Sequence, residues 1–170
     1  MDLAAFEPRL EHALREGLAA FAAEHTDETF YAVAIHTVYR ELGATLGVPA
    51  LAASSNEAGP AADDPSSFWS ARFTPADWPY SEIDLPDREP LEHELTEYAT
   101  RGDEDEWRET QGLYFAMLER IARRLLADAR RLLRTSDDFI CYWHDEEFGV
   151  ELARSMIAPA VAQRVFAREA

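Results

Sequence analysis

Apolar residues recur every three or four positions along the first part of the chain. The recurring positions are Leu3, Phe6, Leu10, Leu14, Leu18 and Phe21. This spacing places them on one face of a helix, with most charged residues on the opposite face. We therefore predict an amphipathic helix that ends near His25. Pro8 fits this helix only in or near its first turn, because a proline further along removes a backbone hydrogen bond.

Four later segments have the aromatic and β-branched composition of strands. They are Thr29–Arg40, Val48–Ser54, Phe68–Phe73 and Phe139–Trp143. The first segment is mostly apolar on both faces, which indicates a central strand covered on two sides. The glycines that follow it predict a hairpin with the second segment. The segment Tyr80–Pro86 is expected to be extended.

Three further helices are predicted in the second half of the chain. Asp87 can cap a short helix, and a longer one begins where Asp103 and Glu106 have the spacing of a capping box. A run of arginines in the last turns of the longer helix suits its C-terminal carbonyls and predicts a solvated, salt-bridged face. The segment Val150–Ala167 forms a closing helix that Pro159 is expected to kink.

Together these elements predict one α+β domain that spans residues 1–170. We expect a mainly antiparallel sheet of about four or more strands, packed by the N-terminal, the long central and the C-terminal helices. A chain of this length can bury a core without a disulfide. Cys141 is the only cysteine, which excludes an internal disulfide and a cysteine-cluster metal site. It lies within the apolar run FICYW, where we expect it to be buried and unreactive.

The charge of the chain narrows the classes of partner. The formal net charge is −17, from 33 acidic and 16 basic residues. Such a protein repels nucleic acids and anionic membranes and attracts basic partners. The chain also has no apolar run close to the roughly 20 residues of a membrane span, and its start does not resemble a secretory signal. We expect a cytoplasmic protein that binds no nucleic acid, membrane or cofactor, with a basic protein as the partner.

The segment Phe68–Tyr80, FWSARFTPADWPY, concentrates aromatic residues between the two halves of the chain. Thr74 followed by Pro75 predicts a short helical turn, and Trp69 and Phe73 suit the core. Packing in the core explains the aromatic residues, but it explains the carboxylate of Asp77 beside Trp78 less well. We therefore predict a groove for a protein partner here. Its candidate residues are Asn56, Glu57, Asp77, Trp78 and Tyr80. The alternative is that Trp78-Pro79 closes over the sheet edge, and this is favoured because the stability gained from buried aromatic side chains is by itself enough to explain them.

The sequence WHDEE after the last predicted strand is the densest cluster of potential metal ligands. If that strand continued, His144 and Glu146 would point to the same face. Two such side chains are half of a divalent metal site, which His36 or Glu57 could complete. The alternative is a strand that ends in acids before the last helix, where carboxylates favour the helix N-terminus. No paired-histidine or CxxC spacing supports a metal.

The order of several motifs resembles an uncharacterised bacterial family, domain of unknown function 4303. The motifs are FYAVAIHTVY, SSNEA, RFTPADWPY and FICYWHDEE, and the resemblance covers about Phe6 to Phe166. The chain departs from the family's pattern at Phe73, where tryptophan is frequent, and at Glu57-Ala58, where Thr-Glu-Glu follows the asparagine. The resemblance implies a small cytosolic α+β domain. By analogy with other small acidic families near toxin genes, it also implies an immunity role, and it supplies no catalytic residues.

Three functions remain open at the level of sequence. The absence of a nucleophile elbow or a phosphate-binding loop, together with the acidic charge, favours a non-catalytic interaction protein, of immunity type against a basic effector. The alternative is a metal-assisted hydrolase. Its candidate residues are His36, His144, Glu146 and Glu147. A scaffold or a subunit of an oligomer is the third possibility.

Overall fold

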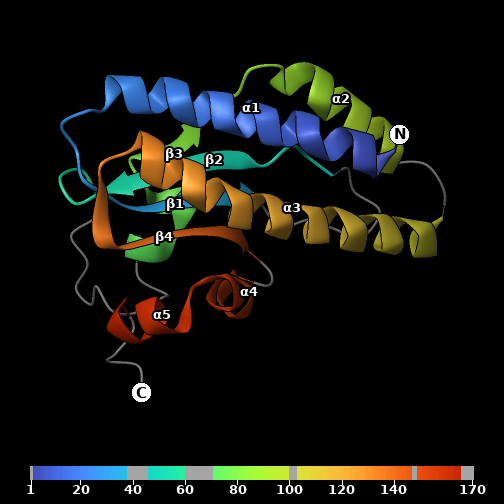
Figure 1. Cartoon of the computed structure of the whole chain (residues 1–170). Coiled ribbons are helices and arrows are strands. Elements are labelled where there is room, and N and C mark those ends of the chain that lie inside the picture. Colours follow the sequence, from blue (N-terminus) through green and yellow to red (C-terminus); the bar gives the residue numbers. More distant parts are fainter. Residues whose placement is uncertain (1, 38–45, 60–70, 100–102, 147–148, 166–170) are drawn as a thin grey trace.

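A four-stranded mixed sheet lies at the centre of the molecule in the computed structural model (Figure 1), which describes residues 2–37, 46–59, 71–99, 103–146 and 149–165. The strands are β1 (Phe30–Thr37), β2 (Ala50–Ser55), β3 (Tyr80–Ile83) and β4 (Thr135–Asp145). Their order across the sheet is β3-β2-β1-β4. The β1–β2 and β2–β3 pairs are antiparallel, and β1 and β4 are parallel. The sheet is therefore mainly antiparallel, as the sequence predicts.

Helices cover both faces of this sheet (Figure 1). The helices are α1 (Leu3–Glu24), α2 (Arg88–Ala99), α3 (Glu104–Leu132), α4 (Gly149–Met156) and α5 (Pro159–Val165). Helices α1 and α3 lie side by side over one face, and α4 and α5 lie beyond β4 on the other. Two short 3₁₀ turns, η1 (Ala71–Phe73) and η2 (Pro75–Asp77), also pack on this second face. None of the helices in the described ranges is long and apolar enough for a membrane span.

Neighbouring residues of β4 show how the two layers are separated. The Cys141 thiol contacts the carbonyl of Ala122 in α3, whereas the Tyr142 hydroxyl donates to the carbonyl of Phe73 in η1. Successive strand residues point to opposite faces, so both faces of the sheet are packed. All eight residues of β1 are buried, which confirms the prediction of a central strand. Burial raises the pKa of Cys141 to about 12, as expected for an unreactive thiol.

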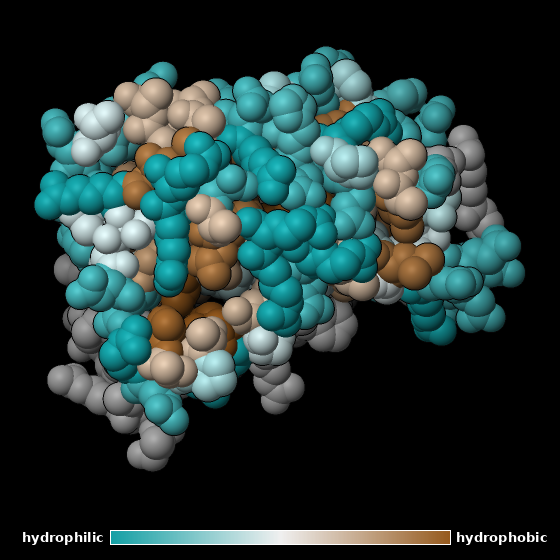
Figure 2. Space-filling model, viewed as in Figure 1, coloured by the Kyte–Doolittle hydropathy of each residue, from teal (hydrophilic) through white to brown (hydrophobic). Residues whose placement is uncertain are grey.

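Salt bridges connect α1 and α3 along their exposed sides. The Glu7 carboxylate binds the guanidinium groups of Arg120 and Arg124, each at 2.6 Å, and Arg15 binds Asp128 at 2.7 Å. The hydrogen bond from Arg120, the largest influence, helps to hold the pKa of Glu7 below its ordinary value. Figure 2 shows mainly hydrophilic residues over these helices. The arginine run is thus a salt-bridged face as predicted, with partners on α1 as well as on its own helix.

Three of the four predicted strands are confirmed and one is wrong. The segment Thr29–Arg40 contains β1, Val48–Ser54 overlaps β2, and Phe139–Trp143 lies within the longer β4. Strands β1 and β2 pair antiparallel as the predicted hairpin requires, and residues 38–40 lie outside the described ranges. Phe68–Phe73 does not supply the third strand: residues 71–73 form η1, and residues 68–70 are not described. The third strand is Tyr80–Ile83, within the segment expected to be extended.

The predicted capping signal of α3 is confirmed, and the prediction for the closing helix is corrected. Asp103 accepts hydrogen bonds from the backbone of Asp105 and Glu106, and Glu106 accepts from the backbone of Asp103, which confirms the capping box of α3. The closing helix is two helices, α4 and α5, rather than one kinked helix. Pro159 begins α5, because a proline fits the first position of a helix and disfavours a helical residue before it.

Candidate functional site

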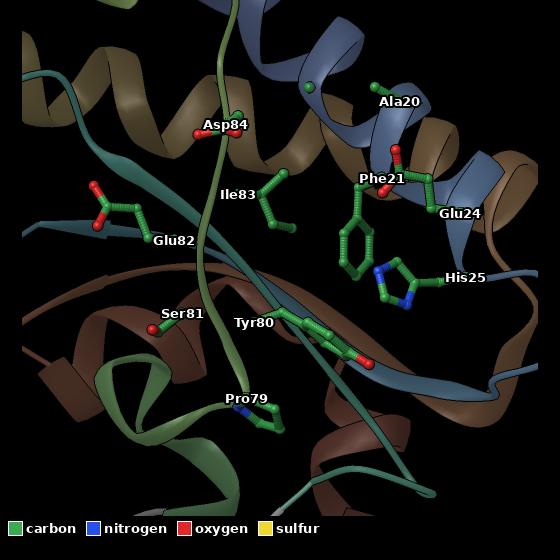
Figure 3. A pocket seen from close by; sticks show the side chains of 11 residues that line it. Ala20, Phe21, Glu24, His25, Pro79, Tyr80, Ser81, Glu82, Ile83 and Asp84 are labelled. Carbon is green, nitrogen blue, oxygen red and sulfur yellow. The ribbon is translucent and has the colours of Figure 1, made fainter.

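A pocket of about 400 Å³ lies between the C-terminal half of α1 and strand β3 (Figure 3). The residues that line it are Gly17, Ala20, Phe21, Glu24 and His25 on the α1 side and Pro79, Tyr80, Ser81, Glu82, Ile83 and Asp84 on the β3 side. These segments meet because β3 is the outermost strand at one edge of the sheet, beside α1. The pocket is therefore formed by a helix and a sheet edge.

Three aromatic rings form one wall of the pocket. Phe21 and His25 stack with their ring centroids 4.2 Å apart, because residues four positions apart on a helix share a face. Tyr80 approaches both rings edge-on, at 5.0 Å from Phe21 and 4.6 Å from His25. Figure 3 shows the three side chains converging from α1 and β3. The wall is thus apolar and rich in π-electrons.

The Glu28 carboxylate holds this wall in place. One of its oxygens accepts a hydrogen bond from the Tyr80 hydroxyl at 2.6 Å and lies 2.9 Å from Nδ1 of His25, and the other accepts one from the Ser55 hydroxyl. Burial alone would raise the pKa of Glu28, but these hydrogen bonds outweigh it and hold the pKa below its ordinary value of 4.5. Burial, and then the Glu28 carboxylate, raise the pKa of Tyr80 to about 12. At neutral pH an ionised Glu28 therefore binds a neutral Tyr80.

Replacing Glu28 by glutamine should destabilise the protein at neutral pH by about 1 kcal/mol, because charge-assisted hydrogen bonds are stronger than neutral ones. The folded-state pKa of Glu28 is depressed, so its stabilisation is present above the ordinary value of 4.5 and is lost as the pH falls through the folded pKa. The difference in melting temperature between wild type and Glu28→Gln should therefore shrink below about pH 4. Thermal unfolding followed from pH 7 to pH 3 measures it. A difference that is constant over this range would contradict the assigned role of the carboxylate.

Acidic side chains surround the aromatic wall. Glu24, Glu82 and Asp84 line the same pocket, and all three are exposed. The Arg88 guanidinium approaches the Glu82 carboxylate only to 3.9 Å, and 36% of the Arg88 side chain and 72% of the Glu82 side chain are exposed. Ion pairs of this kind are weak because water screens them. The pocket therefore combines an aromatic wall with an excess of negative charge at its rim.

Among the residues that the sequence proposed for partner binding, Asn56 and Glu57 connect neighbouring segments. The Glu57 carboxylate accepts a hydrogen bond from the backbone amide of Thr29 at 2.8 Å, and this bond lowers the pKa of Glu57. The Arg72 guanidinium donates to the side-chain oxygen of Asn56 at 3.2 Å and lies over the Tyr31 ring at 3.7 Å. Both candidates are exposed, and they tie the end of β2 to the start of β1 and to η1.

Trp78 and Tyr80 lie on opposite faces of the sheet. Trp78 is 3% exposed, packs edge-on against Tyr142, and donates its indole N–H to the carbonyl of Arg72 at 3.0 Å. It is therefore a core residue on the side of η1 and η2, whereas Tyr80 faces α1. Asp77 is exposed at the end of η2. The predicted groove is thus not assembled as one surface, and Tyr80 is the only one of its five candidate residues that lines the α1–β3 pocket.

The structure brings together two of the candidate metal ligands. His36 and His144 are partners in the parallel β1–β4 ladder, with ring centroids 5.6 Å apart, and Glu146 Oε1 lies 3.7 Å from Nε2 of His36. Burial, and then the nearby His36, lower the pKa of His144 to about 4. Glu147 lies outside the described ranges, and Glu57 is at the opposite end of β1. Within those ranges, no group of three His, Cys, Asp or Glu residues is placed to hold a metal ion.

The sequence interpretation missed the helical half of the pocket. Phe21 was assigned to the core stripe of the first helix, and Glu24 and Glu28 were given no role. The available signal was the spacing of Phe21, Glu24 and His25, which places an aromatic ring, an acid and an imidazole on one face at the end of a helix. This spacing indicates a site only when Tyr80 is known to lie opposite these three residues, and the position of Tyr80 depends on the fold.

The chain matches a known protein family. Residues 10–130 match a family model described as "Domain of unknown function (DUF4303)". No curated protein and no solved structure matches the chain. The matched region contains most of α1 and α3 together with β1, β2, β3 and α2, and so includes both walls of the pocket.

Proposed function

The chain belongs to the DUF4303 family, a family of unknown function, and we propose that it is a non-catalytic interaction module that binds a basic segment of a protein partner in the α1–β3 pocket. The observation that supports this proposal is the combination of an aromatic wall and an acidic rim in one pocket. The form of this function that we expect is an immunity-type role, in which the protein neutralises a basic effector in the cytoplasm.

A cationic side chain fits both features of the pocket. The faces of aromatic rings attract ammonium and guanidinium groups, most strongly where water is partly excluded. Phe21 and Tyr80 supply such rings at the pocket wall, and the carboxylates of Glu24 and Asp84 stand at its rim. A guanidinium group can stack on a ring and bind a carboxylate at the same time, which a compact ammonium group does less well. We therefore expect arginine to be preferred over lysine.

The charge of the whole protein favours the same partner. A net charge of −17 produces a field that accelerates encounters with basic proteins and repels acidic ones. The Glu28 hydrogen bonds fix Tyr80 and His25 before any partner arrives. A binding site whose side chains are already ordered loses less conformational entropy on association. The proposal thus accounts for the partly buried Glu28 carboxylate behind the wall as well as for the exposed carboxylates around it.

Neutralising the rim should weaken binding of a basic peptide. We expect the Kd of a hexa-arginine peptide, measured by isothermal titration calorimetry, to rise about fivefold to tenfold in the double variant Glu24→Gln/Asp84→Asn, because two charge pairs are lost. The matched control is Glu109→Gln/Asp137→Asn, which removes the same two charges from exposed positions in α3 and β4. It should change the Kd by less than about twofold. Equal losses in both variants would mean that only net charge matters, and would contradict the pocket.

Fewer observations support the alternative function, a metal-assisted hydrolase, than support the interaction module. The adjacency of His36 and His144 favours it, and the 3.7 Å approach of Glu146 adds one oxygen. A catalytic zinc ion takes three protein ligands and leaves one position open. Because the described residues offer no suitable group of three, the histidine pair alone supplies too few donors. The interaction module is therefore the function that the geometry favours.

A further inference from the structure

Strand β3 lies at an edge of the sheet and forms part of the pocket. It stands at one end of the strand order, and in the described part of the chain it pairs only with β2. We propose that the basic segment of the partner binds as an added strand along the outer edge of β3, with an arginine side chain in the α1–β3 pocket. This inference rests on the proposed function and specifies how the partner's backbone is recognised.

The shape of the pocket supports binding along the strand edge. Six consecutive residues, Pro79–Asp84, line it. Figure 3 shows Tyr80 and Ile83 pointing toward α1 and Ser81 and Glu82 pointing to the other side of the strand. A pocket over one face of a strand would meet only side chains that point to that face. Because this pocket contacts both sets, it follows the edge of β3 rather than one of its faces.

The dimensions of the site suit a short peptide strand. The four residues of β3 span about 13 Å, which is enough for a strand of about four residues. When a peptide adds to a sheet edge, main-chain hydrogen bonds provide affinity, and side-chain pockets provide specificity. Here the aromatic wall beside Tyr80 would receive one side chain of the peptide, and Glu24 and Asp84 would stand near it.

The charge of the edge selects the occupant. Exposed edge strands are prone to pair with a second copy of the same chain, and charged residues on the edge oppose such pairing. Glu82 places a carboxylate on β3, with Glu24 and Asp84 close by. Two copies of this edge would bring like charges together, whereas an arginine-bearing strand would bring opposite ones. The occupant is therefore a basic segment of another protein and not a second copy.

A peptide with a methylated backbone can distinguish binding as an added strand from binding through an arginine side chain alone. The probe is an eight-residue peptide of alternating arginine and threonine, acetylated and amidated, and the matched control is the same peptide with every backbone nitrogen methylated. Both peptides carry the same charges, but the second cannot donate main-chain hydrogen bonds. We expect its Kd for the full chain to be at least about tenfold higher. Hydrogen exchange at the amides of residues 80–83 should also slow when the first peptide binds.

Each outcome of this experiment distinguishes the two proposals. If the Kd values of the two peptides agree within about twofold and the amide exchange rates of residues 80–83 do not change, the proposal of an added strand is wrong. The proposed pocket for a cationic side chain is then still supported. If neither peptide binds at millimolar concentration, the proposed function fails as well. Slower exchange at residues 80–83 together with loss of binding on methylation supports the added strand.

Discussion

Replacing Trp78 with alanine should lower the free energy of unfolding by about 3–5 kcal/mol, the range for truncating a buried tryptophan. Its side chain is 3% exposed and packs against the rings of Tyr31 and Tyr142 beneath the sheet. The variant also leaves the carbonyl of Arg72 without the indole donor. Urea unfolding followed by circular dichroism measures the change. If the variant is partly unfolded under the assay conditions, its apparent affinity for any partner falls in proportion to the folded fraction, so stability must be measured before binding is interpreted.

Asp77 provides the control for this prediction. It is adjacent in sequence but exposed at the end of η2, and Asp77→Ala should change stability by no more than about 0.5 kcal/mol. A Trp78→Ala variant that unfolds at the wild-type urea concentration and still loses binding of the hexa-arginine peptide would contradict the core assignment. It would instead support the groove that the sequence suggested for this segment.

The parts of the fold that the sequence predicts are those with strong local signals. The strand β1 has apolar residues on both faces, and this pattern is typical of a central strand whatever its neighbours are. The start of α3 is marked by Asp103 and Glu106, whose reciprocal hydrogen bonds involve only residues close in sequence. In both cases the local chemistry and the tertiary structure favour the same conformation, which is why sequence reasoning succeeds there.

The Phe68–Phe73 segment shows why one strand was misplaced. Its aromatic residues suit a strand and a core equally well, and composition cannot separate the two. In the structure Phe73 is 2% exposed in η1, and its carbonyl accepts a hydrogen bond from Tyr142. A side chain from β4, distant in sequence, thus satisfies a backbone group that a strand would have paired in its ladder. No local pattern encodes that partner.

The candidate site was predictable only in part for a related reason. Tyr80 stood out because of its residue type and its neighbours in sequence. Its contacts with Phe21, His25 and Glu28 depend on β3 lying at the sheet edge beside α1. Trp78, two residues earlier, lies on the other side of the sheet because it ends η2 before strand β3 begins, whereas residues i and i+2 of one continuous strand would share a face. The aromatic residues of this segment are therefore close in sequence but do not form one surface.

Helix α1 packs against the chain at the end of β3 at Gly17, and replacing this glycine with alanine should destabilise the protein. A Cβ atom there would lie 2.6 Å from the carbonyl oxygen of Asp84 and 2.8 Å from a methyl carbon of Leu85. The first neighbour is backbone, so α1 or the chain after β3 must move. Overpacking costs about 1–3 kcal/mol, and a clash with backbone falls in the upper part of this range, at about 2–3 kcal/mol, which outweighs the roughly 1 kcal/mol that alanine gains over glycine within a helix. We expect a net loss of about 1–2 kcal/mol.

Gly112 in α3 is the matched control, because it is also a glycine inside a helix. It is exposed, and a Cβ atom built there meets no atom within 4 Å. Gly112→Ala should therefore stabilise the protein by about 1 kcal/mol, so the two glycine-to-alanine variants should differ by about 2–3 kcal/mol with opposite signs. Urea unfolding of both variants measures this difference. Equal stabilisation in the two would show that α1 does not approach Asp84 closely, and the pocket between α1 and β3 would then be wider than the structure has it.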